Sequence, residues 1–390
     1  MFASDILKVL YSPKKAFQEI VQNPKYFGPL LIIVLLVIAN VGFGYALMSK
    51  TYIEQILPNG LNKDEWTENS TLWVATPGAA IVDNYNDFIN GTEAYSVYGE
   101  KSKEFSINNS AQIWMQLTGI GPINLLGPDG YKNLSLRIKE ISPARNPDNA
   151  TIYLFSVAPS SYFHRSLAQD FSNPMVNVWN NLTIPLGSDG WSSTGAAADW
   201  SNISGLKLEF TWLASSNITL LFDDFFFRGP FKSQLEAYGT TYLLQFPVVA
   251  VMQFVITWVF LSGVIFIMVK GFKGKLVWKP LLIVVGFALV TLFVQTVVNA
   301  VVYITSPTVR VPLEYFGTER EHETILNAIS DQTWLFSQII RLTQIAVPIW
   351  IIALCSLAIR MLAEFSWAKS VLVGVVAYFV TTWVESFLIG

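Results

Sequence analysis

Eight asparagines of this chain lie in the pattern Asn-x-Ser/Thr, the acceptor pattern for N-linked glycosylation. They are Asn69, Asn90, Asn108, Asn133, Asn149, Asn181, Asn202 and Asn217. The rest of the sequence has none, although it also contains asparagine. Eighteen asparagines lie between Asn59 and Asn217, and eight acceptors are more than chance would produce from them. We therefore predict that this segment meets a glycosylation machinery, carries N-linked glycans and faces away from the cytoplasm.

Residue patterns typical of catalysis are missing from the sequence. The two histidines, His164 and His322, are far apart, and no H-E-x-x-H, paired C-x-x-C, G-x-S-x-G or P-loop pattern occurs. The two carboxylates of a glycosidase cannot be located from spacing alone. The net charge of −3 is too small to imply nucleic-acid binding. We therefore predict a protein that is not an enzyme and does not bind nucleic acid.

The composition is that of a membrane protein. Mean hydropathy is +0.42, with 52% apolar and 14% charged residues, which lies outside the range of soluble globular proteins. The single cysteine, Cys355, lies in an apolar run, so the glycosylation-acceptor segment has no disulfide. Luminal domains of eukaryotes usually have several disulfides. Abundant acceptors without cysteine therefore favour an archaeal cell surface.

Five apolar segments are long enough to cross a bilayer, which takes about 20 residues. They are 29–48, 241–268, 281–304, 338–362 and 368–388. Lysines precede the first segment and fill the short loop after the second, whereas the loop 305–337 is acidic. Because basic loops remain in the cytoplasm, we predict a multi-pass plasma-membrane protein with a cytoplasmic N-terminus. Residues 49–240, the loop 305–337 and the C-terminus are then extracytoplasmic.

The N-terminal segment, residues 1–28, has helical character. Apolar residues recur at helical spacing over 4–23, with lysines on the other face. Ser12 followed by Pro13 predicts a break between two short cytoplasmic helices. We expect these helices to pack under the bundle and orient the first span. The alternative is an interfacial helix that binds anionic lipid or a cytoplasmic partner. A cleaved signal peptide over 1–48 is not expected, because the apolar run begins too late and is too long.

The same region resembles a known family. The run from Leu7 to Ile20, followed by Pro29-Leu30-Leu31, is similar to the start of prokaryotic Yip1-domain membrane proteins. The turn from Lys270 to Lys275 after the second span is also similar. The resemblance covers 1–50 and 235–390, and implies a five-span helical bundle without catalytic residues. The long insert between the first and second spans departs from the family's compact form, which suggests that the function lies outside the membrane.

The insert itself has strand periodicity. Short runs that alternate apolar and polar residues are separated by Gly, Pro, Asn and Asp, and the clearest run is 206–212. After a linker, 49–70, residues 71–230 are therefore predicted to form an all-β antiparallel sandwich of jelly-roll type. In this pattern Trp212 alternates with polar residues and is expected in the core.

A second resemblance lies in the insert. The order of aromatic and apolar residues from Trp179 to Phe227 resembles the C-terminal half of carbohydrate-binding, galactose-binding-like jelly rolls, and 83–88 is similar to their first strand. In such folds the first and last strands often share a structural calcium ion, which prefers oxygen ligands. The resemblance implies one calcium ion held by Asp83 or Asp87 with Asp224, or with Asp223 as an alternate. The other interpretation is that these are edge and turn carboxylates without metal.

Aromatic residues supply the candidates for ligand binding. Seven of the thirteen tryptophans lie in the exterior segment, and sugars stack their apolar faces on such rings. Trp191, in a Gly/Ser/Asp loop, is the expected exposed platform, with Tyr162 and His164 as further candidates. Trp200 is expected to close one end of the sandwich.

Polar residues also occur inside the predicted spans. They are Asn40, Gln253, Gln295, Asn299, Arg341, Gln344 and Glu385. Arg341 and Glu385 fall at similar depth, so we expect an ion pair within an amide-lined cluster. A role in holding the helices together is favoured over transport or proton transfer.

These observations predict a non-enzymatic surface protein in which a five-span helical bundle carries a glycosylated jelly-roll domain. The domain is expected to bind a glycan, an envelope component or a membrane-protein partner. One alternative is a transporter or channel component with the sandwich as a lid. The other is an accessory subunit of a membrane complex.

Overall fold

The computed structural model describes residues 2–59, 64–90, 97–156, 160–171 and 176–388. The chain divides into two compact units. The helical unit consists of residues 1–52, 233–309 and 330–390, and the β-rich unit consists of residues 53–232 and 310–329.

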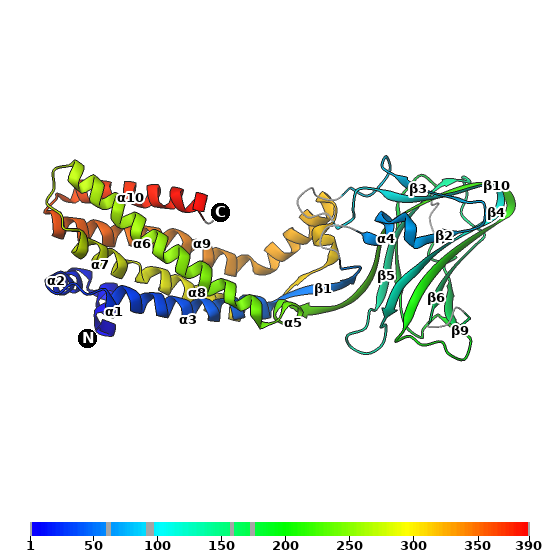
Figure 1. Ribbon diagram of the computed structural model, residues 1–390, viewed down its shortest axis with the longest axis horizontal. Helices are drawn as coiled ribbons and strands as arrows, with labels where there is room; N and C mark the ends of the chain where they lie inside the picture. The colour runs from blue at the N-terminus through cyan, green and yellow to red at the C-terminus, as the bar shows by residue number, and fades with distance from the viewer. Residues whose placement is uncertain (1, 60–63, 91–96, 157–159, 172–175, 389–390) are drawn as a thin grey trace. The chain divides into compact units, whose positions relative to one another are not determined.

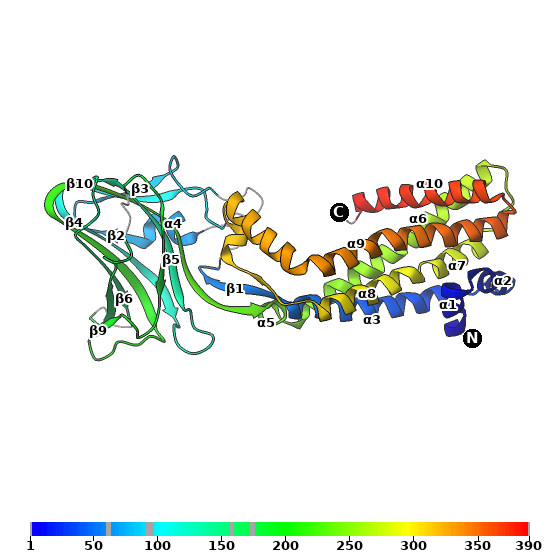
Figure 2. The same cartoon turned by 180° about the vertical axis from the view of Figure 1, so that it is seen from behind.

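The helical unit contains long apolar helices that lie side by side in Figures 1 and 2. Its elements are α1 (Phe2–Tyr11), α2 (Pro13–Gln22), α3 (Phe27–Lys50), α5 (Gln234–Tyr238), η2 (Thr240–Leu244), α6 (Gln245–Gly271), α7 (Trp278–Ala288), α8 (Val290–Thr305), α9 (Glu319–Ala363) and α10 (Trp367–Leu388). Five helical stretches of the described chain are long and apolar enough to cross a membrane, namely 27–50, 240–271, 278–305, 319–363 and 367–388.

These helices are apolar on their outer faces as well as in the core. On α3, Leu30, Val34 and Ile38 recur every four residues and are 51%, 53% and 64% exposed. The opposite face of α3 packs closely on its neighbours, because a Cβ added at Gly28 would lie 1.9 Å from the ring of Phe287. Small residues at such positions allow helices to approach each other. A helix that is apolar all round suits a lipid environment.

The N-terminal helices α1 and α2 are separated at Ser12, which stands before Pro13 and makes no side-chain capping bond. Their apolar face is buried in the core of the helical unit, where Val9 and Phe17 are 0% exposed. The structure therefore favours packing against the bundle over an interfacial helix free to bind lipid or a partner.

Helix α9 begins earlier than predicted. The segment 305–337, expected as a loop, contains β11 (Val309–Val311), η3 (Leu313–Phe316) and the first turns of α9. Thr318 and Glu321 cap the helix reciprocally: the Glu321 amide donates to Thr318 Oγ1 at 3.3 Å, and the Thr318 amide donates to Glu321 Oε2 at 2.9 Å. This T-x-x-E capping box is a sequence signal for the start of a helix. The prediction instead assigned the whole segment to a loop because of its acidic composition.

The β-rich unit contains β2 (Trp73–Ala75), β3 (Ala80–Asn84), β4 (Ser102–Ile123), β5 (Asn133–Ser142), β6 (Asn149–Phe155), β7 (Tyr162–Ser166), β8 (Asn180–Pro185), β9 (Ser192–Thr194) and β10 (Ile203–Ser233). It also contains α4 (Glu65–Glu68) and η1 (Ser70–Leu72), while β1 (Thr51–Leu57) pairs with β10.

Two long strands, β4 and β10, pass through both layers of this unit. Residues 203–211 of β10 pair with β6 on one side and with the second half of β4 on the other. After register shifts between Thr211 and Ile218, β10 continues beside β5 and the first half of β4. Such irregularities bend strands and let them change layer, and Figure 1 shows β4 and β10 curving together.

The resulting sandwich has a first layer of β2, β4, β10, β6, β7 and β9, and a second layer of β3, β4, β10, β5 and β8. The core between them is apolar, with Leu206, Leu208 and Phe210 of the first layer and Leu134, Leu136 and Ile138 of the second at 0–1% exposure. Trp212 is 3% exposed, as predicted for a core residue. The prediction of an antiparallel β-sandwich joined to an apolar helical unit is thus confirmed at this level.

Candidate functional site

Part of the outer side of the second layer, at β10 and β5, is covered by other segments of the same unit. Phe226 of β10 is fully buried in a cluster with Ile89, Tyr98 and Leu313, which come from three different segments. This cluster covers the outer side of β10 at Phe226, whereas the outward residues Asn181, Thr183 and Pro185 of β8 are exposed.

Two arginines attach residues 310–329 to this covered side. Arg228 of β10 donates two hydrogen bonds to Glu54, at 2.8 and 2.7 Å, and two to Glu314, at 2.6 and 3.0 Å. Arg137 of β5 forms an ion pair with buried Asp224 at 2.9 Å and a second one with Glu321. Paired hydrogen bonds of this kind are among the strongest in proteins, so the covering segment is firmly held.

The outer side of the first layer, in contrast, is a surface of polar and aromatic side chains. On each strand these residues alternate with the core residues, as Tyr153 does between Ile152 and Leu154. We call this surface the open face. It is defined by Trp114 and Gln116 of β4, Lys207 and Glu209 of β10, Thr151, Tyr153 and Phe155 of β6, Tyr162 and His164 of β7, and Ser192 and Thr194 of β9.

Strand register places five of these residues in one row across the sheet. Gln116 pairs with Lys207, Lys207 with Tyr153, Tyr153 with His164, and His164 with Ser192. Because paired residues on neighbouring strands lie about 5 Å apart, the row crosses five strands on one side of the sheet.

The aromatic rings of the open face contact one another. The rings of Tyr153 and His164 stack, with centroids 6.0 Å apart and planes inclined by 27°. Tyr162 lies edge-on to Tyr153 and to Phe155, with centroid distances of 5.6 and 5.9 Å. All four side chains are half-buried, so each is fixed by its neighbours while part of its surface remains accessible. Fixed rings on a sheet form a stacking platform that needs little ordering on binding.

Charged groups lie at the edge of this platform. The Lys207 ammonium lies 4.2 Å from the Tyr153 ring centroid and 2.6 Å from a carboxylate oxygen of Glu209. Burial raises the pKa of Tyr153, and nearby Glu209 contributes to the shift, so the phenol stays protonated and retains its donor. The open face therefore offers donors, acceptors and apolar ring faces together.

Two of the three predicted ligand residues, Tyr162 and His164, lie on the open face. Trp191, predicted as an exposed platform, is half-buried and lies outside the open face. Its ring packs edge-on against Trp200 at 5.4 Å, and its indole nitrogen donates to the Pro185 carbonyl at 2.9 Å. Trp200 in turn stacks on buried Phe163 at 3.9 Å. The two tryptophans thus close one end of the core.

Nine of the eleven residues that define the open face escaped the sequence prediction, among them Trp114, Tyr153, Lys207 and Glu209. Lys207 and Glu209 were recognised only as the polar members of the alternating run 206–212. Alternation along each strand indicates that such residues face outward. Only the pairing between strands shows that they meet.

The four aspartates from which the calcium ligands were predicted each have partners within the protein. Asp83 accepts hydrogen bonds from Lys101 at 2.9 Å and from buried Lys103, while Asp87 accepts one from Lys139 at 2.5 Å. Burial alone would raise the pKa of Asp83, but the hydrogen bonds from these lysines and Ser70 outweigh it and lower the pKa to about 2.

The other two aspartates have different partners. Asp223 accepts backbone hydrogen bonds from Ile89 and Asp224, at 2.7 and 2.9 Å, and Asp224 pairs with Arg137. Across the described residues, no three Asp, Glu, His or Cys side chains are grouped so as to hold a metal ion. Lysine or arginine thus pairs with Asp83, Asp87 and Asp224, whereas Asp223 is held by backbone amides, and the calcium site stays a prediction.

The predicted glycosylation acceptors all lie in the β-rich unit, and none of them is buried. Six are exposed and two, Asn133 and Asn202, are half-buried. Asn149 alternates with Thr151 and Tyr153 on β6, so it lies on the same side of the sheet as the open face.

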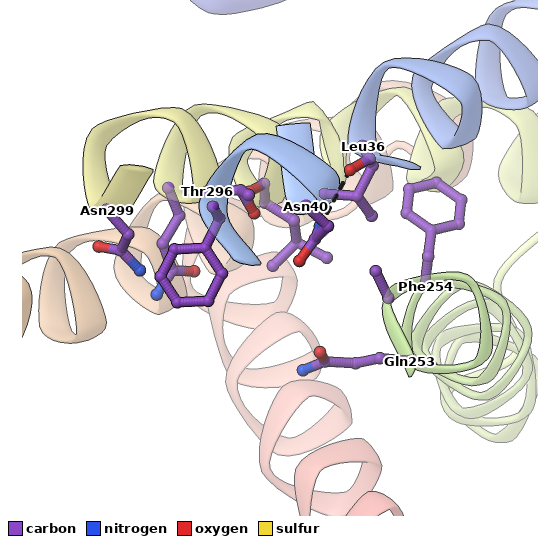
Figure 3. Close-up of a pocket in the computed structure, with 10 residues that line it drawn as sticks. Leu36, Asn40, Gln253, Phe254, Thr296 and Asn299 are labelled. Atoms are coloured by element: carbon purple, nitrogen blue, oxygen red, sulfur yellow. Dashed lines mark hydrogen bonds between the residues drawn. The ribbon is translucent and has the colours of Figure 1, made fainter. Parts of the chain in front are cut away.

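The polar residues of the helical unit fall into two groups. Asn40, Gln253, Gln295 and Asn299 line one cavity (Figure 3). Arg341 and Gln344 are instead exposed on α9. Glu385 accepts a hydrogen bond from Thr257, because α10 packs against α6. The expected Arg341–Glu385 pair is thus not formed.

Comparison with known proteins gives likenesses in structure alone. The sequence matches no protein-family model and shows no significant match to a curated protein. The resemblance of the helical segments to Yip1-domain proteins therefore stays a prediction.

The solved structures that resemble this chain include carbohydrate-binding modules and part of an enzyme. A family 11 carbohydrate-binding module from Clostridium thermocellum, in complex with a β-1,3-1,4-mixed-linked tetrasaccharide, is 13% identical, with 45% of this chain and 95% of that one covered and a TM-score of 0.30. A family 30 module of a cellulosomal cellulase from the same organism is 14% identical, with 38% of this chain and 83% of that one covered and a TM-score of 0.25.

A β-1,2-glucanase from Parabacteroides distasonis is 14% identical over 39% of this chain and 22% of the enzyme, with a TM-score of 0.26. Similarity at this level says nothing about function.

Proposed function

We propose that this protein is a membrane-anchored, non-enzymatic surface protein that binds carbohydrate on the open face of its sandwich. The observation that carries the proposal is the row from Gln116 to Ser192, in which aromatic rings and hydrogen-bonding side chains share the uncovered side of the sheet. On the other outer side, Phe226 and its neighbours cover part of β10, which leaves less strand surface for a ligand there.

The chemistry of the open face fits a glycan. A sugar ring has an apolar face and a rim of hydroxyl groups, which pair with aromatic rings and with mixed donors and acceptors respectively. Tyr153 and Tyr162 supply the rings, while Gln116, Lys207 and Glu209 supply the polar partners. A row that crosses five strands suits an extended oligosaccharide better than a single sugar.

Binding is better supported than hydrolysis. Glycosidases need two carboxyl groups placed on either side of the bond that breaks. Glu209 is the one carboxylate among the residues that define the open face, and it is paired with Lys207 at 2.6 Å. The face can hold a glycan but has no second acid for its cleavage.

The helices support a membrane anchor. Five stretches are long and apolar enough to cross a bilayer, and α3 carries apolar side chains on its outer face. With the lysine-rich turn 270–279 in the cytoplasm, the positive-inside rule places the β-rich unit and its eight Asn-x-Ser/Thr acceptors outside. N-linked glycans on this unit, and a plasma-membrane location, belong to the same proposal.

The test uses the full chain in lipid nanodiscs. We expect a polysaccharide array to identify a ligand, and calorimetric titration to show that Tyr153→Ala weakens its binding about tenfold or more. Tyr85→Ala is the matched control, because Tyr85 is 60% exposed and lies outside the open face. An array without any binder, or equal affinity in Tyr153→Ala and wild type, would refute the proposal.

A further inference from the structure

The helical unit contains a cavity of about 200 Å³ that opens to its surface beside exposed Gln253, and its polar lining has no role in binding glycan. Three helices contribute to it at helical spacing: α3 through Leu36, Asn40 and Phe43, α6 through Ala250, Gln253 and Phe254, and α8 through Leu292, Gln295, Thr296 and Asn299. Figure 3 shows Asn40, Gln253, Thr296 and Asn299 around the same space.

The four carboxamides of this cavity are only partly paired within the protein. Asn40 donates to the Leu36 carbonyl at 2.9 Å, and Asn299 accepts from Thr343 at 3.3 Å. The side chains of Gln253 and Gln295 have no hydrogen-bond partner within the described residues. Donors and acceptors are therefore both available, and an unpaired amide in an apolar surrounding costs roughly 1–3 kcal/mol. Two amides without a partner, Gln253 on α6 and Gln295 on α8, together with the two partly paired amides beside them, indicate that the cavity holds a polar molecule.

The lining also restricts what that molecule is. None of the ten lining residues is ionisable, so nothing there compensates a net charge on a ligand. Phe43 and Phe254 provide apolar surface beside the amides. A volume of about 200 Å³ lies below the range of about 300–1,000 Å³ typical of drug-sized ligands, so the ligand is small.

We propose that this cavity binds a small uncharged polyol of about the size of glycerol. Each hydroxyl group both donates and accepts, as a carboxamide does, and the carbon skeleton of the polyol can contact the two phenylalanine rings. The inference rests on the proposed membrane placement of the helices, because lipid would leave the amides without water. It is independent of glycan binding by the sandwich.

The test is saturation-transfer NMR with glycerol on the full-length protein in lipid nanodiscs. The wild type is expected to give a signal that saturates at millimolar concentration. The double variant Gln253→Leu/Gln295→Leu should lose at least nine-tenths of it. Leucine suits a membrane helix, so the variant is expected to fold as well as the wild type. Ala250→Leu keeps all four amides but fills the cavity, and should lose the signal as well.

Gln344→Leu is the matched control, because Gln344 is an exposed amide on α9 that does not line the cavity. It should retain the full signal. No glycerol signal in the wild type, or the same signal in the cavity variants, would overturn the proposal. The open-face variant Tyr153→Ala should retain the glycerol signal, which separates this test from that of glycan binding.

Discussion

Arg228→Met removes the guanidinium that links β10 to Glu54 and Glu314, and it should destabilise the β-rich unit strongly. Arg228 is 16% exposed and Glu54 is 7% exposed, so the pair is largely shielded from water. Methionine keeps most of the side-chain volume but leaves two carboxylates without their cation. The covering segment 310–329 also loses one of its two arginine links.

The size of the effect follows from the burial of the partners. Removing one member of a buried ion pair costs about 3–5 kcal/mol, and Glu314, which is 28% exposed, can turn toward water. We therefore expect a loss of about 3 kcal/mol. For a unit of this size that corresponds to a Tm lower by about 6–12 °C. Thermal unfolding followed by near-UV circular dichroism, to which the seven tryptophans of the unit contribute, measures it.

Two further variants show whether the carboxylates left without a cation cause the loss of stability. Arg145→Met removes an arginine that lies 3.8 Å from Asp148, with both side chains at least 40% exposed, and should cost less than about 1 kcal/mol. Arg228→Met combined with Glu54→Gln also removes the buried carboxylate that has lost its cation. The double variant should therefore recover part of the lost free energy of unfolding. Equal stability of Arg228→Met and Arg145→Met would refute this reasoning.

Three other predictions concern pH, topology and glycosylation. Burial raises the pKa of Glu140 to about 8, and neither of its carboxyl oxygens has a hydrogen-bond partner. Above pH 6, Glu140 is therefore still protonated in the folded state but ionised in the unfolded state. Because raising the pH favours the ionised, unfolded form, the free energy of unfolding of the unit should fall by about 2 kcal/mol between pH 6 and pH 8. Glu140→Gln should flatten that pH dependence of Tm, and an unchanged slope would contradict it. In a Cys355→Ser background, an impermeant maleimide should label Ser188→Cys on intact cells but Lys273→Cys only after lysis, and the reverse order would contradict the topology. Asn149→Gln should increase glycan binding by native material several-fold, because a glycan on Asn149 shares the open face, whereas Asn217→Gln should leave it unchanged.

Features that depend on local sequence could be predicted. About 20 consecutive apolar residues predict a span wherever they occur, and α3 accordingly contains the whole of 29–48. Alternation over 206–212 places Leu206, Leu208 and Phe210 in the core because the period of a strand is fixed by its geometry. The Ser12-Pro13 break is equally local.

Features that depend on pairing between distant segments could not be predicted. Asp83 lies opposite Lys103 in the β3–β4 register, so a lysine neutralises the carboxylate that was expected to bind calcium. The platform is another case, because Tyr153 meets Lys207 and His164 only through the register of three strands. Trp191 lies in a loop whose Gly, Ser and Asp residues predict exposure, yet its ring packs edge-on against that of Trp200.

The contacts between polar residues of different helices could not be predicted either, because they too depend on how distant segments pack. Arg341 and Glu385 fall at similar depth in their spans, but depth does not fix the direction in which a side chain points around its helix. Thr257 on α6 meets Glu385, whereas Asn40, Gln253, Gln295 and Asn299 do converge.

The most direct test of carbohydrate binding by the open face is hydroxyl-radical footprinting of the full chain, with and without the oligosaccharide that the array identifies. We expect saturating ligand to reduce the modification of Tyr153, Tyr162 and His164 several-fold, while Tyr85 reacts equally in both samples. Unchanged modification of the three open-face residues, or protection confined to other parts of the β-rich unit, would contradict the proposed site.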